Sequence, residues 1–521
     1  MNTYDQLEAG PCDVVVVGAG AAGAVLAARL SEDPDRSVVL LEAGPVPRGA
    51  DGFGPELLDA RLVPGAQTGH RAVRAWPTRL TPDRPWAVPR GQVAGGSTTV
   101  NGGYFIRARR ADFDRWAAVG GPAWGWERVL PFLRALENDL DLGSGEAHGD
   151  HGPVLVRRSR LLHPAEAAFR DAALALGHRA DPDKNDQCPP GFGPVPSNAV
   201  DGIRRNTALS YLTAEVLDRP NLRVLGDCPV RRVLVEHGRV AGVLVEHAGR
   251  TVRLAARSVV VSAGALASAQ LLLLSGIGPR VELERLGIPV VRDAPAVGAG
   301  FSDHPQLALE WGVQDAWGEP ADSWLGGCLH LALGDGLGEV EILQSLVPLA
   351  GLMEGRTTVP GAPLPFLVSA LAPRRTGRLR LASADPRTPP VIEHGYLSTP
   401  QDLQRLRAAA RATAALLETA PFTGHGPGLL APGPAVLDQD GLLDGWIRDH
   451  IGTAQHSCGT VPMGPEGSPD AVVDQFGRVH GVPGLTVADT SILPDAPQRG
   501  PAATAVLVGE VVADALRRDS R

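Results

Sequence analysis

The feature that most constrains the fold is a glycine pattern placed directly after a short run of valines. Val14 to Val17 are β-branched and apolar, as expected for a strand buried on both faces. Gly18-Ala-Gly-Ala-Ala-Gly23 follows at once, and Ala24 to Leu30 has the composition and apolar spacing of a helix. Such glycines allow a tight turn and let the backbone approach a phosphate, to which the helix start presents free N–H groups. The pattern predicts a dinucleotide site.

A second strand supports this interpretation. Ser37 to Leu41 is apolar and ends in Glu42, about 20 residues after Gly23, which completes a β-α-β unit. A carboxylate at this position is placed to accept hydrogen bonds from ribose hydroxyls and disfavours a 2′-phosphate. The alternative is a structural turn in another α/β fold, but the surrounding β-α-β unit favours the dinucleotide.

Composition excludes several classes of protein. The chain has 521 residues, enough for two domains, with 44% hydrophobic and 21% charged residues, as in globular proteins. The net charge of −9 opposes nucleic-acid binding, which needs a basic face. The sequence predicts no secretory signal and no transmembrane segment. We therefore expect a cytoplasmic protein, with peripheral contact at the inner face of the cell membrane left open.

The cysteines and histidines show no metal-binding spacing. The cysteines are odd in number and contain no C-x-x-C pair, so neither a disulfide framework nor a metal site is expected. Five histidines are interpreted as structural or as outer neighbours of a site: His148, His151, His304, His394 and His450.

The rest of the chain alternates strand-like and helix-like segments. Residues 51–89 are rich in Pro, Gly and Arg and are predicted to be loop-like. The spacing predicts a helix over 401–419 and a linker over 421–434. Three segments alternate like antiparallel strands: 222–225, 230–235 and 240–246.

Several further segments resemble signatures of the glucose–methanol–choline (GMC) family of FAD oxidoreductases, in the family's order. These segments are Arg90-Gly-Gln-Val-Ala-Gly-Gly-Ser-Thr-Thr-Val-Asn101, residues 264–278, Val297-Gly-Ala-Gly-Phe-Ser-Asp-His-Pro305, residues 456–464 and residues 487–494. The resemblance implies an α/β fold in which a Rossmann-like FAD-binding domain with a parallel sheet joins a substrate domain built on a largely antiparallel sheet with helices.

The same resemblance implies that the two domains interleave along the chain. We expect the FAD-binding domain at 10–60, 88–159, 201–303 and 451–517. The substrate domain is expected at 160–200 and 304–450, with a lid segment at 61–87.

The resemblance also implies the cofactor and the residues that hold it. The cofactor is FAD, and it is expected to be non-covalent, because Val100 stands where some relatives carry the linking histidine. The glycine-rich segment 95–102 consists of small residues that let a flat ring lie close to the backbone. The expected cofactor-binding residues are Gly18, Gly20, Ala21, Ala22, Gly23, Glu42, Arg90, Gly95, Gly96, Ser97, Asn101, Gly102, Val230, Ala263, Asp489 and Ala503.

By the same resemblance His456 is the catalytic base. Hydride transfer from an alcohol requires the hydroxyl proton to leave, and a neutral imidazole suits that task. The family's second histidine or asparagine falls at position 502, which is Ala502 here and cannot hydrogen-bond an alkoxide. The neighbouring Arg499 is a candidate replacement whose direction the sequence leaves open.

Other segments resemble the mycofactocin-associated branch of the family, among them Asn101-Gly-Gly-Tyr-Phe, Gln455-His-Ser-Cys-Gly and Arg499-Gly-Pro-Ala-Ala-Thr. This implies an enzyme that oxidises mycofactocinol and passes electrons to a respiratory acceptor. The alternatives are a choline or small-alcohol dehydrogenase or oxidase, a non-redox lyase or decarboxylase, and a partner-binding flavoprotein without turnover.

Overall fold

The computed structural model describes residues 7, 10–313, 318–334, 338–371 and 374–519. Its first sheet is built around the opening strand. The order is β11 (Leu222–Leu225), β2 (Val38–Leu41), β1 (Cys12–Val17), β14 (Arg250–Val261), β13 (Arg239–His247) and β12 (Val230–Glu236), and β26 (Leu485–Val487) pairs with the end of β14. The strands β11, β2, β1, the second half of β14 and β26 run parallel. The predicted β-α-β unit is therefore present.

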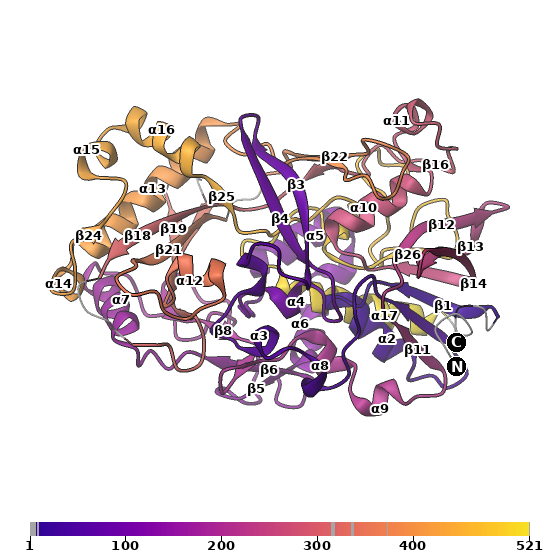
Figure 1. Cartoon of the computed structure of the whole chain (residues 1–521), viewed down its shortest axis with the longest axis horizontal. Coiled ribbons are helices and arrows are strands. Elements are labelled where there is room, and N and C mark those ends of the chain that lie inside the picture. Colours follow the sequence, from indigo (N-terminus) through magenta and orange to yellow (C-terminus); the bar gives the residue numbers. More distant parts are fainter. Residues whose placement is uncertain (1–6, 8–9, 314–317, 335–337, 372–373, 520–521) are drawn as a thin grey trace.

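Two helices pack closely together beside this sheet. They are α2 (Ala21–Leu30), which follows β1, and α17 (Ala502–Arg518) at the end of the chain. A Cβ atom on Gly509 would lie 2.8 Å from Val25 Cβ, so the glycine lets the two helices approach. Figure 1 shows the indigo α2 beside the yellow α17, near both chain ends. The start and the end of the sequence thus meet at one nucleotide-binding layer.

A second sheet lies at the opposite end of the molecule. Its order is β24 (Gly428–Leu429), β18 (Pro305–Gly312), β21 (Leu364–Ala370), β20 (Gly338–Ser345), β19 (Leu325–Leu333) and β7 (Phe192–Pro194), with β25 (Gly452–Thr453) also paired to β18, and the pairs are antiparallel. The helices α7 (Pro164–Ala175) and α13 (Pro400–Leu417) pack against it (Figure 1). The combination of a mainly parallel and an antiparallel layer confirms the predicted mixed α/β fold.

The prediction of a loop over residues 51–89 was wrong. Strands β3 (Val73–Thr81) and β4 (Arg84–Gly91) form a long hairpin there, which stands upright between the two ends of the molecule in Figure 1. This hairpin joins a third sheet, in the order β17 (Ala299–Phe301), β22 (Gly377–Arg380), β23 (Val391–Glu393), β3 and β4. Prolines at 77, 85 and 89 suggested a loop. Pro85 and Pro89 lie on the edge strand β4, where proline is tolerated, and Pro77 lies on β3 at a position without a register partner on β23.

Two smaller expectations also need correction. The segment 222–225 is a strand, but β11 runs parallel to β2, because four residues carry too short a pattern to reveal direction. The predicted linker 421–434 includes the end of helix α14 (Ala420–Thr423) and strand β24. The predicted helix over 401–419 corresponds to α13. Among the described residues, no helix is both long enough and apolar enough to span a bilayer.

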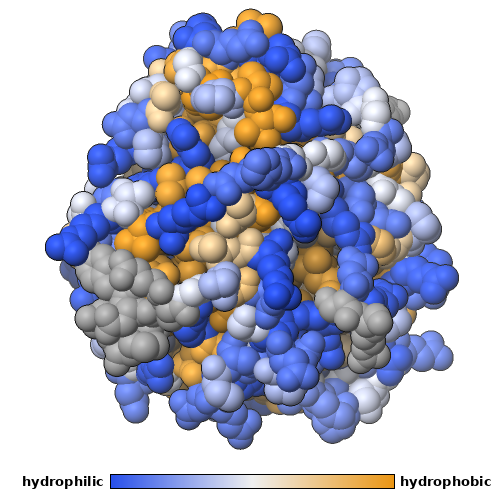
Figure 2. All heavy atoms as spheres, turned by 90° about the vertical axis from the view of Figure 1, so that its right-hand side faces the viewer, coloured by the Kyte–Doolittle hydropathy of each residue, from blue (hydrophilic) through white to orange (hydrophobic). Residues whose placement is uncertain are grey.

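The face formed by the nucleotide-binding end is mainly hydrophilic. Figure 2 shows this face, on which apolar side chains surface in groups separated by hydrophilic ones. Helix α11 (Arg280–Arg285) belongs to this end and exposes Val281, whose relative exposure is 77%. The large apolar clusters lie instead inside the molecule, around the two main sheets.

Candidate active site

Three glycines after β1 have different reasons to be glycine. Gly18 has φ +98°, and a Cβ on it would lie 2.5 Å from the Ser262 carbonyl oxygen. A Cβ on Gly23 would collide with the Gly18 carbonyl. A Cβ on Gly20, in contrast, would meet only Gly96 Cα, at an ordinary 3.9 Å. The packing of the protein explains Gly18 and Gly23, whereas the side of Gly20 that lacks a Cβ faces room that a ligand can use.

The segment that starts at Arg90 packs directly on this loop. The Gly95 N–H donates to the Ala19 carbonyl at 2.8 Å, and a Cβ on Gly96 would come within 2.8 Å of Gly20 Cα. Helix α4 (Ser97–Val100) follows, so the small residues predicted to contact the cofactor lie against the dinucleotide loop. Two segments that are distant in sequence thereby pack backbone against backbone.

Beyond this surface, Asn101 and Gly102 are held by their neighbours. The Asn101 Oδ1 accepts from the Gly103 N–H at 2.9 Å, and the Gly102 carbonyl accepts from Trp324 Nε1 at 2.9 Å. Trp324 precedes β19, so this contact ties the glycine-rich segment to the antiparallel sheet.

Glu42 fixes the conformation of the loop that follows β1. One of its oxygens accepts from the Ala19 N–H and the other from the Gly44 N–H, each at 2.9 Å. Glu42 is buried, and burial raises its pKa. A carboxylate oxygen has more than one lone pair, so a ribose hydroxyl can share these oxygens with the backbone.

The remaining predicted cofactor residues lie at the ends of elements around the same layer. Asp489 follows β26 and accepts from the Gly264 N–H at 2.8 Å and from Ser268 Oγ at 2.5 Å, which fixes the start of helix α10 (Ala265–Leu274). Ala263 lies between β14 and α10, Val230 opens β12, and Ala503 is in the first turn of α17.

These residues fit a dinucleotide cofactor. Helix α2 begins after Gly20, no side chain caps it, and its first internal hydrogen bond runs from Ala24 N to the Gly20 carbonyl. The N–H groups of Ala21 and Ala22 are therefore among those that a helix start leaves for an anion. The glycine-rich segment packed beside them places no large side chain next to these N–H groups.

His456 lies close to a second imidazole. Its Nδ1 is 2.9 Å from Nδ1 of His304, and the two rings stand nearly perpendicular, at 87°. His304 is fully buried, whereas His456 keeps partial exposure. Burial lowers the pKa of His456 to about 3 and that of His304 to about 4. Both rings are therefore neutral at ordinary pH.

Asp303 organises this pair. Its Oδ1 accepts from the backbone N–H groups of both His304 and His456, at 2.7 Å each, and Ser457 Oγ donates to its Oδ2 at 2.6 Å. His394 Nε2 is 3.4 Å from the same Oδ2. Although burial raises it, the pKa of Asp303 is held well below its ordinary value by His394 and Ser457. A single carboxylate thus holds together the two segments that carry His304 and His456.

Two further observations concern the backbone near His456. Gln455 has φ +65°, a left-handed conformation that is costly for a residue with a side chain and is found where a fold constrains it strongly. Arg90 Nη2 donates to Ser457 Oγ at 3.0 Å, which links the glycine-rich segment to the His456 segment. Together they fix the orientation in which the imidazole is presented.

Ala502 begins helix α17 near this imidazole and supplies no polar group. A Cβ on Gly500 would lie 3.6 Å from both Cε1 and Nε2 of His456, so this part of the backbone passes along the ring. Arg499 has a partner on another element: its Nη1 donates to Glu339 Oε2 on β20 at 2.6 Å. The arginine is therefore engaged by the antiparallel sheet.

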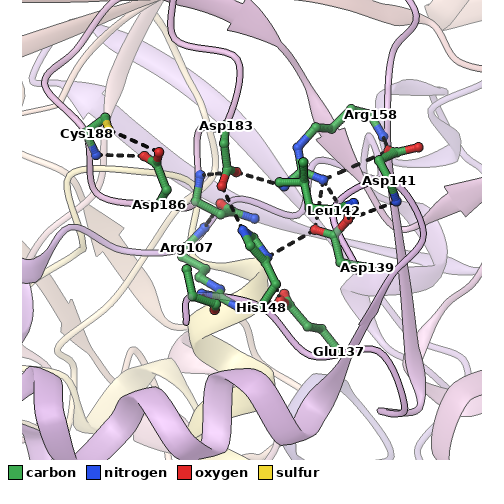
Figure 3. A network of polar contacts seen from close by, with 12 residues as sticks. Arg107, Glu137, Asp139, Asp141, Leu142, His148, Arg158, Asp183, Asp186 and Cys188 are labelled. Carbon is green, nitrogen blue, oxygen red and sulfur yellow. Dashed lines mark hydrogen bonds and ion pairs between the residues drawn. The ribbon is translucent and has the colours of Figure 1, made fainter. Parts of the chain in front are cut away.

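The other histidines lie outside the pair. His148 belongs to a buried network with Glu137, Asp139 and Asp183, whose carboxylates are also bound by Arg107 or Arg158 (Figure 3). His151 is exposed, and His450 stacks on Trp446 at the surface. Cys458 is buried, and burial raises its pKa well above the ordinary value, so its thiol is inert.

A nucleotide-binding layer, an antiparallel layer and a pair of imidazoles define an oxidoreductase that uses a dinucleotide cofactor. The chain belongs to the GMC oxidoreductase family, which it matches over residues 12–306 and 373–509. The chain is accordingly an FAD-dependent oxidoreductase.

Known relatives cover nearly the whole chain. It is 39% identical over 507 residues to an uncharacterised GMC-type oxidoreductase of Rhodococcus erythropolis, covering 96% of this chain and 98% of that one. It is 33% identical over 533 residues to an oxygen-dependent choline dehydrogenase of Rhizobium etli, covering 96% and 95%. Among solved structures, pyridoxine 4-oxidase from Mesorbium loti is 28% identical with a TM-score of 0.89, covering 97% and 99%.

The sequence reasoning missed several residues of the site. Asp303 and His304 lie in a segment that resembles a family motif, but their contact with a histidine 152 residues away could not be read from spacing. The partner of Arg499 was also unknown. Glu339 alternates with apolar residues along its strand, which indicated its face but not what lay opposite.

Proposed function

We propose that this enzyme oxidises the CH–OH group of an alcohol, with His456 as the base that takes the hydroxyl proton. The observation that carries the proposal is the Nδ1–Nδ1 contact of 2.9 Å between His456 and His304. FAD, when bound, supplies the hydride acceptor at its N5 atom. The residues described above would hold it: the first turn of α2 the diphosphate, Glu42 the ribose, and the glycine-rich segment the ring.

The contact between the imidazoles determines which nitrogen is the base. Two neutral rings carry one N–H each, so one Nδ1 donates and the other accepts. The proposal requires the arrangement in which His456 Nδ1 is the donor, because only that arrangement leaves a lone pair on His456 Nε2. His304 Nδ1 then accepts from His456, and the lone pair of His456 is left at Nε2. This is the nitrogen beside Gly500.

The charge of Asp303 offsets part of the cost of protonating a buried base. Burial and His304 lower the pKa of His456, while Asp303 raises it. As the hydroxyl proton arrives at Nε2, the positive imidazolium is attracted by the Asp303 carboxylate, which remains ionised. The pair thereby performs part of the task for which the family uses a second polar residue at the position of Ala502.

We propose mycofactocinol as the donor and a respiratory acceptor for the electrons. The support comes from the segments that resemble the mycofactocin-associated branch, including Arg499-Gly-Pro-Ala-Ala-Thr, which contains Ala502. The second candidate is choline or another small alcohol, which the relationship to the Rhizobium enzyme favours. The non-covalent attachment of FAD and the division into interleaved domains are part of the same proposal.

Anaerobic flavin reduction separates these candidates. The purified yellow protein is mixed with reduced mycofactocin, choline or short alcohols, and loss of the oxidised flavin absorbance is followed. Bleaching by reduced mycofactocin supports the first candidate, and bleaching by choline alone supports the second. Turnover of a donor without net flavin reduction would support a lyase or decarboxylase, and no reduction by any donor would support an electron relay.

The departure at Ala502 has its own test. Ala502→His restores a polar group at that position, and Ala502→Ser is the matched small control. A faster flavin reduction in the histidine variant shows that the missing group limits the rate. An unchanged rate shows that the imidazole pair already supplies what the reaction needs.

A further inference from the structure

A second group of reactive side chains lies on the antiparallel sheet and, among the residues that the structure describes, makes no hydrogen bond to the imidazole pair. His330 on β19 stands directly opposite Glu341 on β20 in the strand register, and Cys328 is two residues before His330, on the same face. The relative exposures of Cys328, His330 and Glu341 are 0%, 1% and 3%. Three side chains with metal-binding atoms are thus buried together on a rigid scaffold of two paired strands.

The distances among these atoms match those of a metal-binding triangle. His330 Nε2 is 3.1 Å from Glu341 Oε2, Cys328 Sγ is 3.8 Å from His330 Nε2, and Cys328 Sγ is 4.0 Å from Glu341 Oε2. Tetrahedral zinc with its usual bonds to sulfur, nitrogen and oxygen separates such ligand atoms by about 3.3–3.6 Å. Shifts of a few tenths of an ångström therefore complete the triangle.

A comparison within the molecule shows why this group differs from the other buried cluster. In the network of Figure 3, Glu137 and Asp139 also lie close to a histidine, but Arg107 and Arg158 donate directly to these carboxylates. Those guanidinium groups already occupy the place of a cation. In the described part of the chain, no arginine or lysine donates a hydrogen bond to Cys328, His330 or Glu341.

The neighbouring cations have other partners. Arg499 donates to Glu339, and Lys184 donates to Asp181 at 2.9 Å. The neutral alternative to a metal is a hydrogen-bonded cluster in which Tyr104 Oη donates to Glu341 Oε2 at 3.1 Å. The Tyr104 bond is compatible with either state, because a carboxylate that binds a metal commonly accepts an outer hydrogen bond that orients it.

We propose that Cys328, His330 and Glu341 form a site for one divalent transition-metal ion of the zinc type, with the fourth position open to water or another small ligand. On binding, the Cys328 thiol releases its proton to solvent and its sulfur forms the bond to the metal. One thiolate and one carboxylate then balance the two positive charges. His330 has no proton to displace beyond a change of tautomer, since burial and nearby cations hold its pKa well below the ordinary value.

The proposal does not rest on the proposed alcohol chemistry, and it is tested without a donor. The FAD-loaded enzyme, prepared without a histidine tag and dialysed, is analysed for metals. We expect about one zinc per chain. Cys328→Ser and Glu341→Gln should weaken zinc binding at least about 100-fold, since even outer substitutions cost 10- to 100-fold. Cys12→Ser, which alters a buried thiol on β1, should keep the metal.

A cobalt titration makes the test conclusive when a variant folds poorly. Cobalt bound to a thiolate gives red d–d bands at wavelengths where oxidised flavin does not absorb. We expect these bands in the wild-type holoenzyme and their loss in Cys328→Ser at an unchanged FAD-to-protein ratio. A wild-type enzyme with neither zinc nor cobalt bands, or a zinc content that the cluster variants leave unchanged, overturns the proposal.

Discussion

Gly20 is the position at which the structure separates what the protein needs from what the cofactor needs. Its φ of −79° is accessible to any residue, and a Cβ there meets only Gly96 Cα at 3.9 Å. Gly20→Ala should therefore leave the free energy of unfolding of the FAD-free protein within about 0.5 kcal/mol of wild type, as for a tolerated substitution. The added methyl group would instead occupy room on the ligand side.

The expected cost falls on cofactor binding. An extra methyl group in a well-packed site costs about 1–3 kcal/mol, which corresponds to roughly a 5- to 150-fold weaker affinity. The assay is a titration of FAD-free protein with FAD, followed by quenching of FAD fluorescence, beside urea unfolding of the same sample. Gly23→Ala is the contrast, because its Cβ would collide with the Gly18 carbonyl and damage the fold itself.

The result that refutes this reasoning is specific. If Gly20→Ala stays folded and binds FAD as tightly as wild type, then the cofactor does not approach the backbone at Gly20. The assignment of the first turn of α2 as the diphosphate site would then be wrong. If Gly20→Ala unfolds, the packing argument fails instead, and urea unfolding detects that outcome separately.

Three further predictions follow from the buried polar groups. His304→Phe should slow flavin reduction about 5- to 150-fold, because it removes a buried hydrogen bond worth about 1–3 kcal/mol. It should also raise the pKa of His456, so that the acid limb of the pH–rate profile moves to higher pH, and an unshifted limb would contradict the role of the pair. Burial lowers the pKa of His148, but Asp139 and its neighbours raise it to about 10. The stability that this group contributes is therefore full below about pH 6.5 and is lost as pH rises through about 10. Urea unfolding should show this loss in wild type and not in His148→Gln. Arg499→Met should lower the free energy of unfolding in urea by about 1.5–3 kcal/mol, because it leaves the Glu339 carboxylate unpaired. Arg499→Lys should retain part of the stability, and equal stability in both variants would contradict the ion pair.

Local patterns predicted the nucleotide-binding layer well, for a physical reason. In Val14 to Gly23 the strand, the tight turn and the helix start are encoded by adjacent residues, so little depends on distant contacts. The helix over α13 was predicted for the same reason, because its apolar stripe repeats over 18 residues. The hairpin β3–β4 was not predicted, because its strands are stabilised by pairing with each other, whereas their prolines locally indicate a loop.

The candidate site divides in the same way. His456 and the glycines lie in short motifs, whereas the metal-binding triangle depends on the register between β19 and β20, which places Glu341 opposite His330. A register shift of one residue would move Glu341 to the other face of the sheet. The contact between α2 and α17 through Gly509 likewise could not be predicted from the sequence, because it joins helices near opposite ends of the chain.

Asp303 explains how two distant histidines come to face each other. One oxygen of this carboxylate accepts from the backbone N–H of His304 and from that of His456, so it positions the two backbone segments rather than either ring. An amide oxygen in Asp303→Asn could keep both backbone bonds, but it would lack the charge that raises the pKa of His456. The substitution should therefore preserve the paired geometry while making proton acceptance less favourable. Retention of the pair with slower proton transfer would separate the positional role of the carboxylate from its electrostatic role.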